Sequence, residues 1–66
     1  MNLEVFTYKG RLELYNGKTR RFEFESNNRS YDRWMVMEKA VKVLSLDHEQ
    51  VMDLEFFSIT TTNNND

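Results

Sequence analysis

The chain has 66 residues and a formal net charge of −2, and it contains neither cysteine nor proline. This length allows one domain, and the absence of cysteine excludes disulfides and thiolate metal sites. No apolar run approaches the roughly 20 residues that cross a membrane, and the start lacks the basic and apolar stretches of a signal peptide. We therefore expect a cytoplasmic protein with one compact domain over residues 1–60.

Basic residues are confined to one part of the chain. All nine Lys and Arg residues lie between Lys9 and Lys42, and only acidic charged residues follow. Such asymmetry fits either a nucleic-acid-binding face or a solvated surface whose charges pair between strands. We favour the paired surface, because acidic and basic segments of a sheet commonly align.

Two alternating segments, residues 3–15 and 18–26, predict a β-hairpin around Asn16-Gly17. A two-residue turn would place Phe22 and Phe24 on the face opposite Leu12 and Leu14. A three-residue loop with a left-handed Gly17 places these four side chains on one face and pairs Leu14 with Lys18 and Tyr8 with Phe24. Because strand register follows the buried face, we choose the three-residue loop.

Gly10 interrupts the first alternating segment without changing its phase. We interpret this position as a bulge or bend within one long strand. The alternative is a second tight turn at Lys9-Gly10, which would break an otherwise continuous alternation.

A helix follows, with Ser30 as the expected N-cap and an end near Leu44 or Ser45. Its apolar stripe recurs at three- and four-residue steps and comprises Trp34, Met37, Ala40, Val41 and Leu44. We expect Trp34 in the core, so that Trp34→Ala should cost about 3–5 kcal/mol.

Residues 46–50 should form a loop or a short turn capped by Ser45. The third strand is expected from Val51 to about Thr60, with Met52, Leu54 and Phe56 facing the core. The polar residues 61–66 carry nothing to bury and should form a disordered tail.

The element order β-β-α-β predicts an α+β two-layer sandwich, an antiparallel three-stranded sheet with one helix on one face. The strand order should be 2-1-3, with the third strand antiparallel to the first. Pairing Lys9 with Asp53 would bring Tyr8 beside Leu54 beneath the helix.

This register also predicts an uncovered apolar patch on the other sheet face. Its members are Leu3, Val5, Phe57 and Ile59. A contiguous apolar patch on a small protein usually marks an interface, here either a homodimer contact or another protein. The alternative is that the tail or a bend in the strand covers it.

The tip of the hairpin is a second predicted partner-binding region. A helix of roughly 15 residues is about 22 Å long and covers only some seven strand residues, so Leu12, Leu14 and Tyr15 could project beyond it. Tyr15 close to Arg20 and Arg21 would suit a protein-binding arm. An ordinary exposed hairpin is the alternative.

The sequence contains no convincing catalytic or metal-binding constellation. His48 is the one histidine and falls in the expected loop, with no activated nucleophile in view. Asp47, His48 and Glu49 are adjacent and point in different directions, which is a poor metal site. We expect no enzyme activity, no catalytic residues, no metal and no cofactor.

In size and element order the chain resembles small phage-encoded inhibitors of host proteins, including Dmd-like antitoxins, although it shares no motif with them. The resemblance implies a protein-binding module that masks the surface of a host enzyme, a toxin or an assembly subunit, and it assigns no residue a role. The alternative is a nucleic-acid-binding protein in which Tyr15 stacks on a base. Its phosphate contacts would be Lys18, Arg20, Arg21, Arg29 and Arg33.

Overall fold

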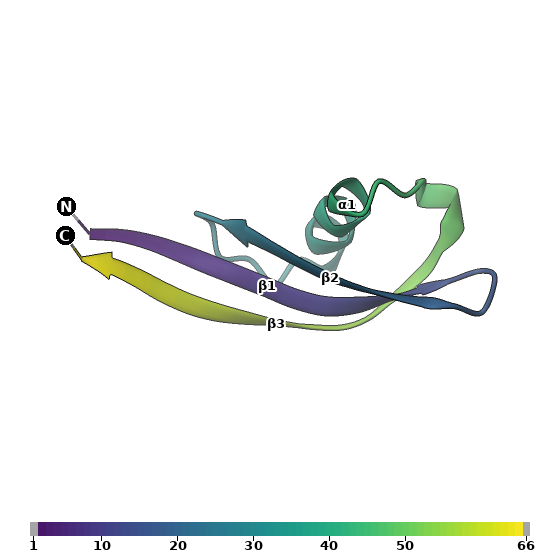
Figure 1. Ribbon diagram of the computed structural model, residues 1–66, viewed down its shortest axis with the longest axis horizontal. Coiled ribbons are helices and arrows are strands. Elements are labelled where there is room, and N and C mark those ends of the chain that lie inside the picture. The colour runs from purple at the N-terminus through teal and green to yellow at the C-terminus, as the bar shows by residue number, and fades with distance from the viewer. Residues whose placement is uncertain (1, 66) are drawn as a thin grey trace.

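A computed structural model describes residues 2–65, and the side chains of residues 4–62. The three strands form one antiparallel sheet in the order β2-β1-β3, and α1 lies on one of its faces (Figure 1). This confirms the predicted α+β architecture and strand order. The elements in chain order are β1 (Asn2–Leu14), β2 (Thr19–Ser26), α1 (Arg33–Val43), the 3-10 helix η1 (His48–Gln50) and β3 (Val51–Asn65).

The β1–β2 hairpin has the predicted three-residue loop. The backbone N–H of Leu14 donates to the carbonyl of Lys18 at 2.9 Å, and Gly17 has a φ of 85°. This left-handed conformation favours glycine, because a Cβ would be strained there. The predicted pair of Tyr8 with Phe24 is also present.

Strand β1 runs without a turn through Gly10, as expected. A Cβ at this position would lie 2.5 Å from Cζ of Phe22 and would also clash with the carbonyl oxygen of Phe56. Glycine is therefore required here by close packing rather than by an unusual φ. The bulges lie just beyond it, between Arg11 and Leu12 and between Glu13 and Leu14, in the pairing with β3.

The expected helix start at Ser30 is wrong. Asp32 is the N-cap, because its carboxylate accepts a hydrogen bond from the backbone N–H of Trp34 at 3.1 Å. The hydroxyl of Ser30 instead accepts from the backbone N–H of Asp32. At its other end, α1 stops at Val43, next to the predicted Leu44.

The buried side of α1 is rotated relative to the predicted stripe. Val36, Ala40 and Val41 are buried, whereas Trp34 is 61 % exposed. Trp34 occupies the first helical turn, at the edge of the buried arc, and its ring lies 6.3 Å from that of His48. The expectation of a core Trp34 is therefore wrong.

The predicted register between β1 and β3 is also wrong. Lys9 lies opposite Ser58 rather than Asp53, a displacement of five residues along β3. An odd displacement moves each side chain to the other face of the sheet. The bulge between Arg11 and Leu12 then restores the phase, so that Leu54 is opposite Leu12 and both are buried. The second bulge, between Glu13 and Leu14, shifts the phase once more and places Val51 opposite Leu14.

This displacement exchanges the inward and outward residues of β3. Phe57 and Ile59 pack against the core, whereas Met52 and Phe56, which were expected inside, are exposed. The core side of β3 therefore consists of Val51, Leu54, Phe57 and Ile59.

Strand β3 is longer than predicted, because it extends to Asn65 instead of ending near Thr60. Thr61 lies opposite Phe6, so the segment expected to be a disordered tail pairs with β1 as far as Asn65; Asp66 lies outside the described residues. The short turn before β3 is η1, and its N-cap is Asp47 rather than Ser45.

Tyr8 links the sheet to the segment that precedes α1. Its side chain is fully buried, and its ring stacks on Phe24 with 4.8 Å between centroids. The hydroxyl donates to the carbonyl of Asn28 at 2.7 Å and accepts from the backbone N–H of Ser30 at 2.8 Å. A buried polar group without partners would be costly, so these bonds fix the loop that places α1 over the sheet.

Candidate binding surface

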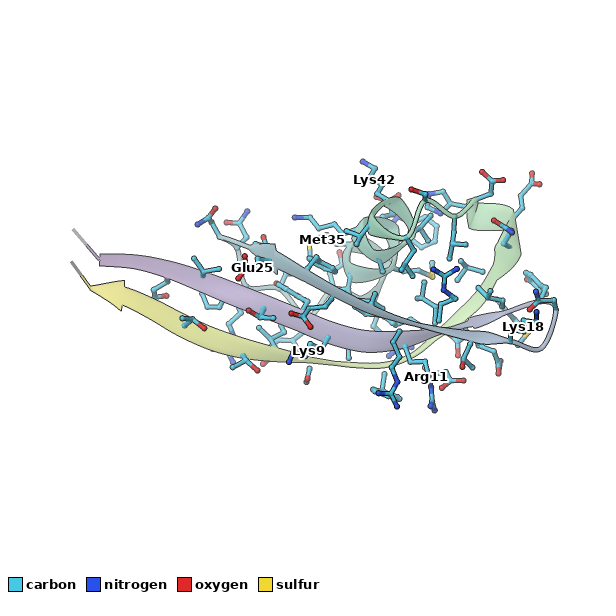
Figure 2. The ribbon with its side chains drawn as sticks, in the orientation of Figure 1. Lys9, Arg11, Lys18, Glu25, Met35 and Lys42 are labelled. Atoms are coloured by element: carbon cyan, nitrogen blue, oxygen red, sulfur yellow. The ribbon has the colours of Figure 1, made fainter. Side chains whose placement is uncertain are left out.

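The sheet face away from α1 carries the candidate site, which we call the outer face. Lys9 and Arg11 on β1 point away from the helix (Figure 2). Around Gly10, neighbouring side chains of all three strands surround an open hollow of about 610 Å³. It is lined by Lys9, Gly10, Arg21, Phe22, Glu23, Phe56 and Ser58.

Arg11 is held in place on both sides. Its Nε donates to the carboxylate of Glu55 at 2.5 Å, and its guanidinium lies over the ring of Phe56, 5.0 Å from the centroid. Both charged side chains of the pair are partly covered. A charge-assisted bond combined with a cation–π contact therefore orders Arg11 and supports Phe56 in one position.

Arg21 differs from Arg11 in having no such neutralising contact. It lies on β2 directly opposite Arg11, so the two positive charges face each other across the strands. Among the described side chains none forms an ion pair with Arg21. Like charges placed opposite each other destabilise a sheet, and an incoming carboxylate would relieve this repulsion.

Phe56 is the apolar element of the outer face. It is 53 % exposed, although large aromatic side chains are usually much more buried in a small core. Within the lining of the hollow, Lys9 and Glu23 form an exposed ion pair at 3.9 Å, which contributes little to stability. The outer face thus combines one exposed ring, an ordered arginine and an arginine without a partner.

The structure does not bring together the apolar patch expected from the sequence. Phe57 and Ile59 lie on the helix side, where Phe57 is 6.4 Å from the ring of Tyr8. Val5 is half-buried opposite Thr62, and the backbone of Leu3 lies opposite Asn64, with its side chain outside the described residues. The reason is the register displacement, which moves Phe57 and Ile59 to the helix side of the sheet, away from Val5.

The hairpin tip is smaller than expected. Leu12 and Leu14 are buried in the core, so only Tyr15 of the three apolar residues projects into solvent. The backbone N–H of Tyr15 donates to the carbonyl of Gln50 at 3.0 Å, which ties the tip to η1. A second hollow of about 270 Å³ lies here, lined by Leu14, Tyr15, Asn16, Glu49 and Gln50.

The basic residues of the nucleic-acid alternative are dispersed. Arg20 lies opposite Leu12 and thus on the helix side of the sheet, whereas Arg21 is on the outer face. Arg29 precedes the helix and donates to the hydroxyl of Tyr31, a hydrogen bond that raises the pKa of Arg29. Arg33 donates to the carbonyl of Leu54 at the edge of β3, and Lys18 lies opposite Leu14, where it closes the hairpin loop. These residues do not form a continuous phosphate-binding track.

Phe56 and Arg11 are the site residues that the sequence reasoning missed. The doublet Phe56-Phe57 is the ambiguous signal, since either ring could face the core and the two choices differ by one residue of register. The pairing of Arg11 with Glu55 depends on the bulge between Arg11 and Leu12, which no simple alternation predicts.

Over the part of the chain that the structure describes, no cluster of three His, Cys, Asp or Glu side chains could hold a metal ion. The helices described there are also too short or too polar to cross a membrane. No protein-family model matches the sequence, and neither the curated proteins nor the solved structures contain a significant match.

Proposed function

We propose that the protein is a small, non-enzymatic binding module that masks the surface of another protein through its outer face. The observation that carries the proposal is the half-exposed ring of Phe56, which Arg11 contacts and which lines an open hollow together with Arg21. This hollow lies on the sheet face that α1 does not cover (Figure 2). Aromatic residues and arginine are the side chains most enriched in protein interfaces and their energetic centres.

The chemistry of the hollow supports one kind of partner. An apolar side chain could pack on Phe56, and a neighbouring carboxylate could pair with Arg21, which lacks an acidic neighbour among the described side chains. Arg11 is already ordered by Glu55, so little side-chain entropy is lost when a partner contacts it. We therefore expect a partner segment that presents an apolar and an acidic residue together.

The charge pattern favours a protein over a nucleic acid. Acidic side chains are interspersed on the same face, because Glu23 lies opposite Lys9 and Glu25 lies two residues further along β2. A phosphate backbone would meet these carboxylates as well as the arginines. A protein surface with both signs of charge could complement them.

Masking is the mode of action that requires the least of so small a chain. An inhibitor or antagonist needs only to occupy the working surface of a host enzyme, a toxin or an assembly subunit. The resemblance in size and element order to small phage-encoded inhibitors supports this mode, but it identifies no partner.

The test compares two exposed aromatic residues on different sides of the molecule. Tagged wild-type protein is used to capture partners, and the retained proteins are compared with those retained by Phe56→Ser and Trp34→Ser. Both rings are more than half exposed, so each variant should keep the native circular dichroism spectrum. Phe56→Ser should lose the partner and Trp34→Ser should retain it; the reverse pattern would refute the outer face as the binding surface.

A parallel measurement tests the nucleic-acid alternative. Fluorescence anisotropy with labelled single-stranded and duplex oligonucleotides is recorded at about 50 and about 200 mM salt, since phosphate contacts weaken steeply over this range. We expect no binding at micromolar protein. Salt-sensitive binding that Arg21→Glu abolishes would instead assign the outer face to nucleic acid.

A further inference from the structure

The free edge of β3 is a second surface with a distinct chemistry. Because β1 is the central strand, the side of β3 that faces away from β1 pairs with no other strand among residues 2–65. Arg33 donates to the carbonyl of Leu54 and thereby covers the beginning of this edge. Beyond Leu54, alternate residues of the edge strand β3 present unpaired backbone N–H and C=O groups to their surroundings.

The two edges of the sheet are protected to different degrees. The edge strand β2 carries charged side chains at Arg20, Arg21, Glu23 and Glu25, and such charges discourage pairing with another chain. In β3, no charged residue and no proline occurs from Phe56 to Asn65. The pairing of this segment with β1 is also free of bulges. The β3 edge therefore lacks the features that usually prevent strand addition.

Apolar side chains lie beside this open edge. Phe57 and Ile59 face the helix side, but both remain only partly buried, because α1 lies closer to β2 than to β3 (Figure 1). Tyr31 lies next to Phe57, with 6.2 Å between ring centroids, and is itself largely exposed. An additional strand at this edge would bury more of Phe57 and Ile59.

We propose that the β3 edge pairs antiparallel with the β3 edge of a second copy of this chain, about a two-fold axis at Ile59. The paired segment would run from Phe56 to Thr62, starting just after the part of the edge that Arg33 covers. Ile59 would face Ile59 of the second copy, and Phe57 would face Thr61. Because the segment is uncharged, this isologous pairing brings no like charges together, and the same residues satisfy both copies.

The resulting dimer has a defined geometry. A two-fold axis perpendicular to the sheet produces one continuous sheet, with both helices on one face and both outer faces on the other. Phe56 takes part only at the end of the paired segment, through its backbone, and its ring stays on the outer face. Arg11 and Arg21 lie on the other strands, so the association is separate from the binding function proposed for the outer face. The paired segment is short and the buried area small, so we expect micromolar rather than nanomolar association.

Sedimentation equilibrium of the full chain over about a hundredfold range of concentration tests the proposal. The wild-type mass should rise from the monomer value of 8.0 kDa toward twice that value. Thr60→Lys places a charge on the exposed side of the paired segment and should weaken association about tenfold or more. The matched control Thr19→Lys, on the β2 edge, should leave it unchanged. A wild-type chain that stays monomeric throughout would overturn the proposal, as would equal effects of the two lysines.

Cysteine cross-linking gives a second test, because the chain has no cysteine of its own. Residues directly opposite in an antiparallel pair have Cα atoms about 4.5–5.5 Å apart, which suits a disulfide. Ile59→Cys should therefore form a disulfide-linked dimer under mild oxidation, several times faster than Thr19→Cys. Equal rates in both variants would show that the contact at Ile59 is absent.

Discussion

The two faces of the sheet are built on different physical principles. The helix-covered face holds Tyr8, Leu12 and Leu54, all essentially inaccessible, and the buried hydroxyl of Tyr8 has two hydrogen-bond partners. The outer face carries charged side chains around an exposed Phe56. Burial on the helix-covered face provides the stability of so small a domain, and the outer-face side chains contribute less to it.

This comparison predicts that substitutions toward the core are costly and that those on the outer face are tolerated. The largest effect is expected at Gly10, which lies between the two faces. In Gly10→Val the new side chain would clash with the Phe22 ring and the backbone of Phe56, costing about 3 kcal/mol or more. Urea denaturation measures the loss.

Gly17→Ala is the matched control, because the space around Gly17 is open and only its positive φ opposes a Cβ. A cost of about 1–2 kcal/mol is expected. If Gly10→Val lowered the free energy of unfolding no more than Gly17→Ala, Phe22 would not pack closely against Gly10.

The next largest effect distinguishes two residues that simple alternation treats alike. Leu54 is 2 % exposed and Met52 is 46 % exposed. Leu54→Ala should cost about 2–5 kcal/mol, and Met52→Ala less than about 1 kcal/mol. Thermal or urea unfolding of both variants measures the difference. Equal losses of stability would favour a β3 without bulges, in which Met52 and Leu54 share the buried face, over the bulged pairing.

A smaller contrast concerns the helix. Val36 is inaccessible, so Val36→Ala should cost about 2 kcal/mol through the apolar groups removed and the cavity that remains. Trp34→Ala should cost less than about 1 kcal/mol, in spite of the larger side chain, because the ring is mostly in solvent. A loss of several kcal/mol from Trp34→Ala would show instead that this ring is part of the core.

The smallest stability effect is expected within the outer face. Glu55→Gln removes the charge that faces Arg11, in a pair that is partly exposed to solvent. The expected cost is below about 1 kcal/mol and should shrink as salt is added. Denaturation at low and high salt measures it; a large, salt-independent loss would mean that Arg11 and Glu55 support the fold rather than the surface.

The parts of the fold that were predictable are those fixed by local chemistry. A left-handed Gly17 and the alternation on both sides of it determine the loop and the β1–β2 register, because few residues separate the paired strands. The strand order was predicted from the expectation that the helix runs back along the hairpin and places the third strand antiparallel to the first, which the structure confirms.

The β1–β3 register could not be predicted because it depends on features distant in sequence. Two bulges change the phase of β3, and either ring of the Phe56-Phe57 doublet would satisfy an alternating pattern. The pairing of the polar segment after Thr60 with β1 has no apolar signal at all. Because this register could not be predicted, Phe56 and Arg11 were missed as surface residues.

The helix boundary shows a related limit. Ser30 and Asp32 are both residue types that favour the N-cap position. The choice between them depends on Tyr8, whose hydroxyl accepts a hydrogen bond from the backbone N–H of Ser30. This long-range hydrogen bond leaves Asp32 to cap α1. Val36, Ala40 and Val41 define the side of α1 that faces the sheet, and Trp34 lies outside it.

The most direct test of the account is amide chemical-shift mapping of isotopically labelled protein titrated with the captured partner. If the outer face binds the partner, the changes in amide chemical shift should concentrate around the hollow, at Lys9, Gly10, Arg21, Phe56 and Ser58. Amides of α1 and the buried core should change little. Shifts that cluster instead on α1 or on the hairpin tip around Tyr15, with the outer face unchanged, would contradict the claim that this face is the binding surface.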